Sequence, residues 1–293
     1  MRVYQTNEIK NIALLGSAGS GKTTLAESML FEAGIIKRRG SVEAKNTVSD
    51  YFPVEQEYGY SVFSTVFHAE WNNKKLNIID CPGSDDFVGG AITALNVTDQ
   101  AVILINGQYG PEVGTQNSFR YTEKLKKPVI FLVNQLDSDK CDFETIISNM
   151  QEIYGPKCVQ IQYPIQTGPG FNALIDVLLM KKLTFTGEGK APIVEDIPAG
   201  ELEKAKALHM DLVEKAASRK FHSGMQGIYP STEKIASALG AKGFYKIICN
   251  AWSVAEEYIN EYMPQWVRSA YDLMPLREAI YNIHFPQSAE KLH

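Results

Sequence analysis

Short apolar runs alternate with longer amphipathic stretches along the first half of the chain. Runs bounded by glycine, proline or acidic residues are typical of buried strands, and the stretches between them have helical spacing. The runs predicted to form strands are Ile12–Leu15, Ser61–Trp71, Lys75–Ile79, Ala101–Ile105 and Val129–Val133. The stretches predicted to form helices are Leu25–Leu30, Phe87–Val97, Thr115–Lys124 and about Asp142–Tyr154. This alternation predicts an α/β fold with a doubly wound, mostly parallel sheet.

Two parts of the chain depart from this alternation. Gly34–Glu57 is polar, contains Lys37-Arg38-Arg39 and has no regular apolar period, which predicts a long mobile loop. Between the second and third predicted strands, Asn72-Asn73 is predicted to form a hairpin turn. After Gly155 the elements become shorter and less regular. They are a strand at Val159–Gln166, apolar segments at Ala173–Met180 and Lys181–Phe185, a Gly/Pro/acidic stretch at Gly187–Gly200 and a helix at Glu201–Ala217.

A glycine-rich loop joins the first strand to the first helix. It fits the phosphate-binding pattern G-x-x-x-x-G-K-[ST], and its strand and helix are the context that this P-loop requires. Backbone N–H groups of such a loop surround phosphate oxygens, and the following helix adds partial positive charge. Lys22 would reach the β- and γ-phosphates, and the Thr23 hydroxyl would hold Mg²⁺. The predicted nucleotide-binding residues of the loop are Gly16, Ser17, Ala18, Gly19, Ser20, Gly21, Lys22, Thr23 and Thr24.

Two more candidate loops follow strands. Asp80-Cys-Pro-Gly83 fits D-x-x-G, in which Asp80 would act on Mg²⁺ through water and the Gly83 amide would meet the γ-phosphate. Asn134-Gln-Leu-Asp137 is close to N-K-x-D, in which Asp137 accepts the two guanine protons that adenine lacks. Asn134 would brace the loop, and Gln135 would keep the stem of the usual lysine without its charge. The alternative is a polar turn with Asp137 as the cap of the next helix.

Composition narrows the partners. The chain has 293 residues, a formal net charge of −5 and 44% hydrophobic residues, which suits one large or two small soluble domains. Nothing global attracts DNA, RNA or an anionic membrane. The cysteines Cys81, Cys141, Cys158 and Cys249 have no C-x-x-C spacing, which favours free thiols in a reducing cytoplasm. We find no signal peptide and no run long enough to cross a bilayer, and therefore expect a cytoplasmic protein without a membrane partner.

Two segments have sequences distinctive enough to compare with a family. Glu55–Val62 is similar to E-Q-E-R-G-I-T-I, and Asp80–Phe87 is similar to D-T-P-G-H-V-D-F. With the loops above, residues 9–217 resemble the GTP-binding domain of elongation factor G, the ribosomal translocase, as a divergent paralogue. The resemblance makes residues 1–156 the P-loop core and 157–217 part of that family's inserted subdomain. It implies GTP or GDP with Mg²⁺ as ligands, and a ribosome as the partner of an intact homologue.

Departures from the family pattern concern hydrolysis. Ser61 replaces the threonine that ligates Mg²⁺, so a hydroxyl remains, and Tyr58 replaces an arginine. Ser84 replaces the histidine that activates water, which leaves Lys22 and Ser84 at the catalytic positions. Loss of a positioned catalytic group costs about 10²–10⁴-fold in rate. We expect GTP to bind and to be hydrolysed weakly or not at all, with the neighbouring Asp85 in a solvated acidic turn.

The last part of the chain does not continue the resemblance to the GTP-binding domain. After a joint at 218–224, residues 225–293 are helical and rich in aromatics. The blocks Met225–Lys234 and Leu273–Pro286 resemble RecG, the branched-DNA helicase. The alternative is a diverged GTPase ending, with Tyr245–Ala251 as strand and loop and Ser253–Met263 as helix.

Three hypotheses for function remain at this stage. The first is a GTP-dependent switch. The second is a DNA-associated RecG-like fragment without a motor, which is disfavoured because residues 225–293 have no surplus of basic over acidic residues. The third is a poorly stable chain that binds little, because a missing sheet strand exposes an edge. The sequence leaves the oligomeric state open.

Overall fold

A computed structural model describes residues 3–71, 73–155, 158–187 and 191–217. The predictions made for residues 218–293, which are the joint, the RecG-like blocks and the alternative strand and helix, lie outside the described residues. All statements below concern the described part of the chain.

A five-stranded central sheet has the order β2-β3-β1-β4-β5. Only β2 runs antiparallel to its neighbour β3, and the other pairs are parallel. This arrangement confirms the predicted α/β fold with a mostly parallel sheet. The strands are β1 (Ile9–Gly16), β2 (Thr65–Trp71), β3 (Lys74–Asp80), β4 (Gln100–Asn106) and β5 (Val129–Asn134).

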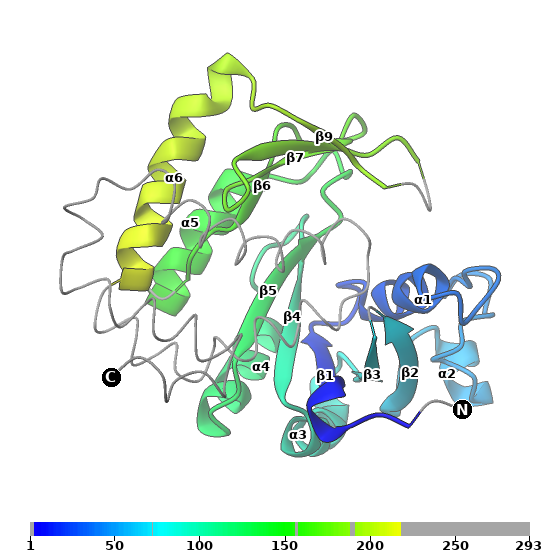
Figure 1. The fold of residues 1–293 in the computed structure, drawn as a ribbon. Coiled ribbons are helices and arrows are strands. Elements are labelled where there is room, and N and C mark those ends of the chain that lie inside the picture. Colours follow the sequence, from blue (N-terminus) through cyan, green and yellow to red (C-terminus); the bar gives the residue numbers. More distant parts are fainter. Residues whose placement is uncertain (1–2, 72, 156–157, 188–190, 218–293) are drawn as a thin grey trace.

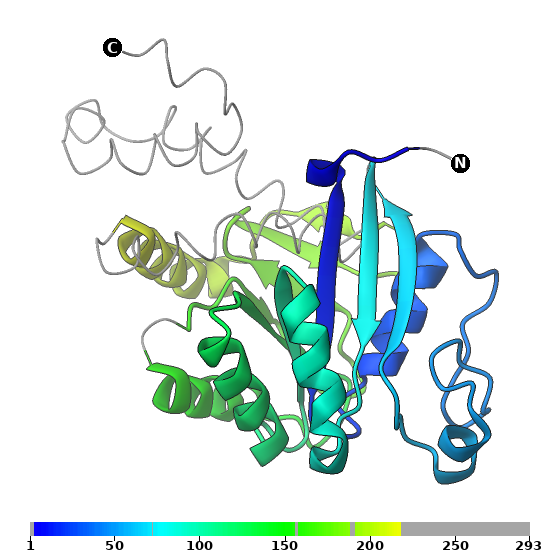
Figure 2. The same ribbon diagram turned by 90° about the horizontal axis from the view of Figure 1, so that it is seen from below.

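Helices cover both faces of this sheet (Figures 1 and 2). One face carries α1, and the opposite face carries α3 and α4. The helix α5 follows β5 and packs at that edge of the sheet. The helical elements of the core are η1 (Thr6–Glu8), α1 (Lys22–Glu32), α2 (Pro53–Tyr58), η2 (Asp85–Phe87), α3 (Val88–Val97), α4 (Val113–Lys124) and α5 (Phe143–Tyr154).

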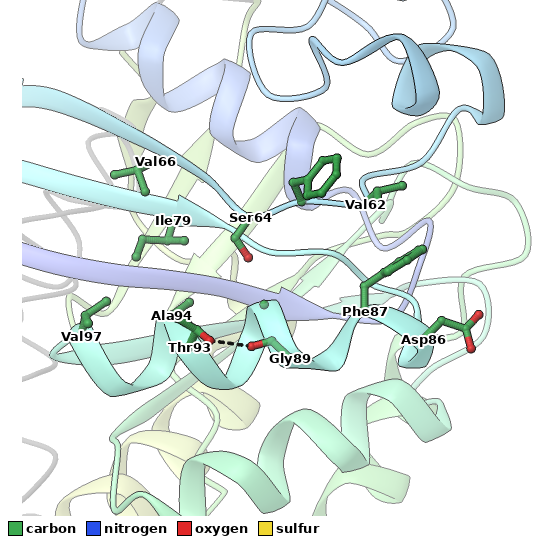
Figure 3. Close-up of a pocket in the computed structure, with 12 residues that line it drawn as sticks. Val62, Ser64, Val66, Ile79, Asp86, Phe87, Gly89, Thr93, Ala94 and Val97 are labelled. Atoms are coloured by element: carbon green, nitrogen blue, oxygen red, sulfur yellow. Dashed lines mark hydrogen bonds between the residues drawn. The ribbon is translucent and has the colours of Figure 1, made fainter.

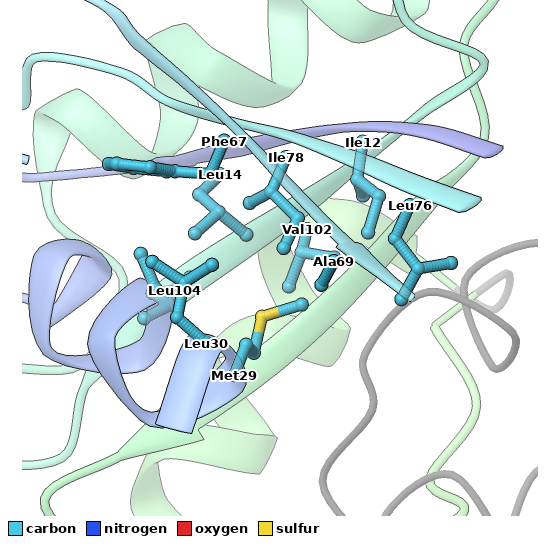
Figure 4. Packing of buried hydrophobic residues seen from close by; sticks show 11 residues of the cluster. Ile12, Leu14, Met29, Leu30, Phe67, Ala69, Leu76, Ile78, Val102 and Leu104 are labelled. Carbon is cyan, nitrogen blue, oxygen red and sulfur yellow. The ribbon is translucent and has the colours of Figure 1, made fainter. Parts of the chain in front are cut away.

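The two sides of β1 build two separate cores. Ile12 and Leu14 pack against Met29 and Leu30 of α1, as Figure 4 shows. Their neighbours on the strand point to the other face, in the cluster that holds α3. Successive strand side chains alternate between faces, so a strand that is covered on both sides is apolar throughout. The rigid sheet fixes the loops that leave its carboxyl edge.

After α5, the chain forms a second sheet, with the order β6-β7-β8-β9 and antiparallel pairing throughout. Its strands are β6 (Gln162–Pro164), β7 (Ala173–Asp176), β8 (Lys181–Thr184) and β9 (Ile193–Glu195), and α6 (Ala199–Ala217) follows them. Tyr163, Ile175 and Ala205 share a hydrophobic cluster with Ile105 and Phe143 of the core. This cluster joins the second sheet and α6 to the edge of the central sheet (Figure 1).

Several predicted elements were wrong in detail. α2 begins at Pro53, within the loop expected at 34–57, and Gly59 in the left-handed region follows its last residue, Tyr58. Glu55 stabilises this turn by accepting hydrogen bonds from the backbone of Phe52, Val62 and Phe63. These partners lie three, seven and eight positions from Glu55, so the helix depends on local polar contacts, which an apolar period does not reveal.

Strand lengths also differ from the prediction. The strand expected to begin at Ser61 begins at Thr65, because the backbone at 62–63 donates to Glu55 and not to β3. The strand expected over Val159–Gln166 is only β6, and the Gly/Pro/acidic stretch contains the unexpected β9. β9 is exposed along its length, so it shows no apolar alternation. Within the described part of the chain, no helix has the length and apolar character needed to cross a membrane.

Candidate functional site

The glycine-rich loop wraps around the side chain of Lys22. Lys22 is 6% exposed, and its Nζ donates to the backbone oxygens of Gly16 at 3.0 Å and Ser17 at 2.8 Å. Burial lowers the pKa of Lys22, and the charge of Asp80 opposes this shift. The loop needs glycine at its ends, since a Cβ on Gly16 would lie 2.3 Å from the Leu104 oxygen. The ammonium group is therefore fixed inside the loop at the start of α1.

Asp80 ends β3 beside the first turn of α1. Its Oδ2 accepts hydrogen bonds from Thr23 Oγ1 at 2.8 Å and from Ser49 Oγ at 2.7 Å. Ser61 Oγ lies 3.4 Å from Thr23 Oγ1. Burial raises the pKa of Asp80 to about 6, while Ser49, Lys22 and Thr23 oppose the shift. The structure thus brings together the three residues predicted to serve Mg²⁺, which are Thr23, Ser61 and Asp80.

Ser49 and Asp50 are site residues that sequence reasoning missed. Both are buried, in a stretch that was expected to be a loop. Asp50 Oδ1 and Asp80 Oδ1 are buried oxygens without a hydrogen-bond partner among the described residues. Burial raises the pKa of Asp50, and a hydrogen bond with Ser61 opposes the shift. The adjacent hydroxyl and carboxylate of Ser49 and Asp50, shortly before Glu55–Val62, were a weak sequence signal of a role in the site.

Gly83 lies directly against the phosphate-binding loop. A Cβ built on Gly83 would be 2.4 Å from Lys22 Nζ and 2.7 Å from the backbone N of Ala18. No side chain fits there without movement, which explains the glycine. The D-x-x-G loop and the P-loop are therefore in backbone contact.

Ser84 has a local role. Its Oγ caps η2 by accepting from the Asp86 backbone at 3.4 Å, and it also lies 3.4 Å from Asp86 Oδ2. Asp85 is exposed and accepts a hydrogen bond from Asn117 of α4 at 3.3 Å. Both side chains are thus engaged within their own turn or with α4, and neither contacts Lys22.

The end of β5 braces the P-loop from the opposite side. Asn134 Nδ2 donates to the Ser20 oxygen at 2.9 Å, and Gln135 Nε2 donates to the Gly19 oxygen at 3.0 Å. Asn106, at the end of the neighbouring strand β4, also donates to the Gly19 oxygen, at 3.3 Å. Asn106 was missed, although a polar residue directly after a buried run at this sheet edge was a clear signal. Amide side chains from two strands therefore hold the loop carbonyls.

Asp137 lies in the next turn with an exposed side chain. The alternative in which Asp137 caps the next helix is wrong, because Asp142 caps α5 by accepting from the Thr145 backbone at 3.1 Å. The loop between β6 and β7 contacts this turn and the residues that follow it. Gly168 N donates to the Leu136 oxygen at 2.8 Å, and Thr167 Oγ1 donates to the Cys141 oxygen at 3.0 Å.

An apolar groove of about 530 Å³ lies next to the site, between β2 and α3 (Figure 3). Val62 and Val66 line one side of it, and Phe87 and Val97 lie on the other. The groove borders the segments that follow Ser61 and Gly83. It is separate from the polar loop that surrounds Lys22.

Fold and site together define a P-loop nucleotide-binding domain. Comparison with known families gives the particular one, because the model described as "Elongation factor Tu GTP binding domain" matches residues 7–265. The chain belongs to this family. The match confirms the GTP-binding resemblance that the loops suggested, and the resemblance to RecG gains no support. The match also passes through the joint predicted at 218–224.

The curated relatives of this chain include proteins named after elongation factor G. The chain is 31% identical over 207 residues to "Elongation factor G-like protein" of Thermotoga maritima, covering 71% of this chain and 29% of the relative. It is 31% identical over 259 residues to "Elongation factor G" of Rhodopseudomonas palustris, covering 85% and 38%. A crystal structure from Thermus thermophilus matches with a TM-score of 0.69 and 27% identity, over 81% of this chain and 36% of that one. The chain therefore spans about a third of the length of these relatives.

Proposed function

We propose that this chain is the GTP-binding switch domain of an elongation-factor-G-like translation factor, which binds GTP and GDP with Mg²⁺ and hydrolyses GTP weakly or not at all. The observation that carries the proposal is the convergence of three strand ends on one loop. Asp80 of β3 bonds to Thr23, while Asn106 of β4 and Asn134 of β5 bond to loop carbonyls. A ribosome is the proposed partner of the intact factor.

The donor set around Asp80 fits Mg²⁺. The described residues include no group of three or more His, Cys, Asp or Glu that could hold a metal. Magnesium in phosphate sites takes few protein ligands and keeps several waters, so hydroxyls and one or two carboxylates suffice. Thr23 and Ser61 would bind it directly and Asp80 through water, where the unpartnered Asp80 Oδ1 is available. The ion would supply charge neutralisation to the β- and γ-phosphates.

Gly83 is proposed to report the third phosphate. Its backbone lies against Ala18 and Lys22, the side of the loop that Lys22 would use to hold the β- and γ-phosphates. A terminal phosphate would have to bind the Gly83 amide or push its loop away. Diphosphate and triphosphate would therefore favour different positions of the D-x-x-G loop, which is the basis of a switch.

The proposal of weak GTP hydrolysis rests on Ser84, which occupies the position of the family's catalytic histidine. Serine has no group that titrates near neutral pH, and the Ser84 hydroxyl is engaged within its own turn. Asp85 is turned to Asn117 of α4. Neither side chain is arranged as a general base for an attacking water.

The test is a titration of the chain with fluorescent GTP beside ATP, followed by single-turnover hydrolysis with and without ribosomes. We expect GTP to bind at least about 100-fold more tightly than ATP, because a base-reading carboxylate is left unpaired by adenine. Ser84→His should speed hydrolysis on ribosomes by at least about 100-fold, the lower end of what a positioned base contributes. Equal affinity for ATP refutes the guanine assignment, and brisk wild-type turnover without ribosomes refutes the role of Ser84.

A further inference from the structure

The residue that replaces the family's lysine is held by a second glutamine. Gln135 has a left-handed backbone, with φ of 59°, and its Oε1 accepts a hydrogen bond from Gln108 Nε2 at 3.3 Å. Its Nε2 donates to the Gly19 oxygen at 3.0 Å. Both ends of the Gln135 amide are therefore satisfied, one by the P-loop and the other by the segment that follows β4.

Gln108 is itself fixed by the same network. Its backbone N donates to Asn106 Oδ1 at 2.8 Å, and Asn106 Nδ2 donates to the Gly19 oxygen at 3.3 Å. The hydrogen bonds close a ring that runs from Gly19 through Gln135, Gln108 and Asn106 back to Gly19. Asn106 is only 5% exposed, so its side chain has a defined position.

The ring determines which way the Gln135 amide faces. An amide has a donating nitrogen and an accepting oxygen, and only the nitrogen can bond to a carbonyl. If the amide turned over, its oxygen would face the Gly19 oxygen and its nitrogen would face the donor of Gln108. The Gly19 oxygen disfavours the turned-over amide, and the hydrogen bond from Gln108 adds to the stability of the observed orientation. A lysine has donors only and therefore no second orientation to exclude.

We propose that Gln108 is a positioning residue for guanine-nucleotide binding, which orients Gln135 so that two neutral amides replace the single charge of a lysine. The inference rests on the proposed function and deepens it. The Gln108–Gln135 pair ties the P-loop to the turn that carries Asp137. Nucleotide affinity should therefore depend on Gln108 only as long as residue 135 is a glutamine.

A double-mutant cycle tests this dependence. The variants are Gln108→Leu, Gln135→Lys and the double variant, with Gln116→Leu on the exposed side of α4 as the matched control. Fluorescent GDP is titrated at fixed Mg²⁺ and salt. We expect Gln108→Leu to weaken binding about three- to tenfold, the effect of one neutral hydrogen bond, and Gln116→Leu to leave it unchanged.

In the Gln135→Lys background, we expect Gln108→Leu to change GDP affinity by less than about twofold, because a lysine has no acceptor for the hydrogen bond that Gln108 donates. Equal losses in both backgrounds, or no loss in either, overturn the inference. Melting of the unliganded variants checks that all are folded. If the wild type does not prefer GDP over ADP, the proposed function fails; if it does and the cycle shows no coupling, only this inference fails.

Discussion

Replacing Lys22 by methionine should separate nucleotide binding from folding. The ammonium group is buried within the P-loop, and its two oxygen partners at 2.8 and 3.0 Å belong to the loop itself. Methionine has nearly the same length and fills the same space without a charge. We therefore expect the unliganded variant to fold, and its affinity for nucleotide to fall sharply.

The expected loss of nucleotide affinity follows from the hydrogen bonds that Lys22 would break and form when a nucleotide binds. Two charge-assisted hydrogen bonds to phosphate oxygens contribute about 1.5–3 kcal/mol each. Binding gives up the two bonds to Gly16 and Ser17, so we take the lower end of the sum, about 3 kcal/mol. This value corresponds to a loss of roughly 100-fold in affinity. At a GDP concentration of about 100 times the wild-type Kd, ligand stabilisation would fall from about 2.7 to about 0.4 kcal/mol.

Thermal unfolding with and without GDP and Mg²⁺ measures this loss. A chain of this size shifts its melting temperature by about 2–4 °C per kcal/mol, so the wild type should gain about 5–10 °C and Lys22→Met about 1 °C. Lys124→Met, at an exposed position of α4, is the matched control and should keep the full shift. A full GDP-induced shift in Lys22→Met would refute the role of the P-loop.

Three further changes test other parts of the account. Thr167→Val removes the hydrogen bond to the Cys141 oxygen and should weaken GDP binding about two- to tenfold in a fluorescence titration, with rescue by Thr167→Ser; unchanged affinity would show that the second sheet does not position the guanine-reading turn. Gly83→Ala should lower the free energy of unfolding in urea by about 1–3 kcal/mol, because its Cβ would lie 2.7 Å from the Ala18 backbone N, and an unchanged midpoint would contradict the close contact. Burial raises the pKa of Asp176 to about 6, so its protonated form favours the fold and this stability is lost as the pH rises from about 4 through 6. Relative to Asp176→Asn, the wild type should lose on the order of 2–3 kcal/mol across this window in urea unfolding, and parallel pH profiles would refute the shift.

The sequence predicted the parts of this structure that depend on local patterns. The apolar run at Ile12–Leu15 located the centre of the sheet, and the glycine-rich loop predicted a helix directly after it, although α1 begins at Lys22 and not at the predicted Leu25. The carboxyl ends of β3 and β5 placed Asp80 and Asn134 beside that loop, because parallel strands end at one edge.

The parts that the sequence did not predict depend on contacts between distant segments. Ser49, for example, reaches Asp80 across 31 positions of the sequence. Gln108 contacts Gln135, and Thr167 contacts the Cys141 oxygen, from segments with no motif of their own. Apolar periods and short motifs describe residues that are close in the sequence. They could not predict these contacts, which exist only after the sheet has formed.

The central claim is that Asp137 reads a guanine base, and exchanging the hydrogen-bond pattern of that residue tests it most directly. An aspartate accepts two hydrogen bonds, whereas an asparagine donates and accepts. Xanthine differs from guanine by an oxygen in place of the amino group, so it matches asparagine. By titration, the wild type should prefer GDP to xanthosine diphosphate, and Asp137→Asn should reverse that preference, each by at least about tenfold. The same order of affinities in both proteins would contradict the account.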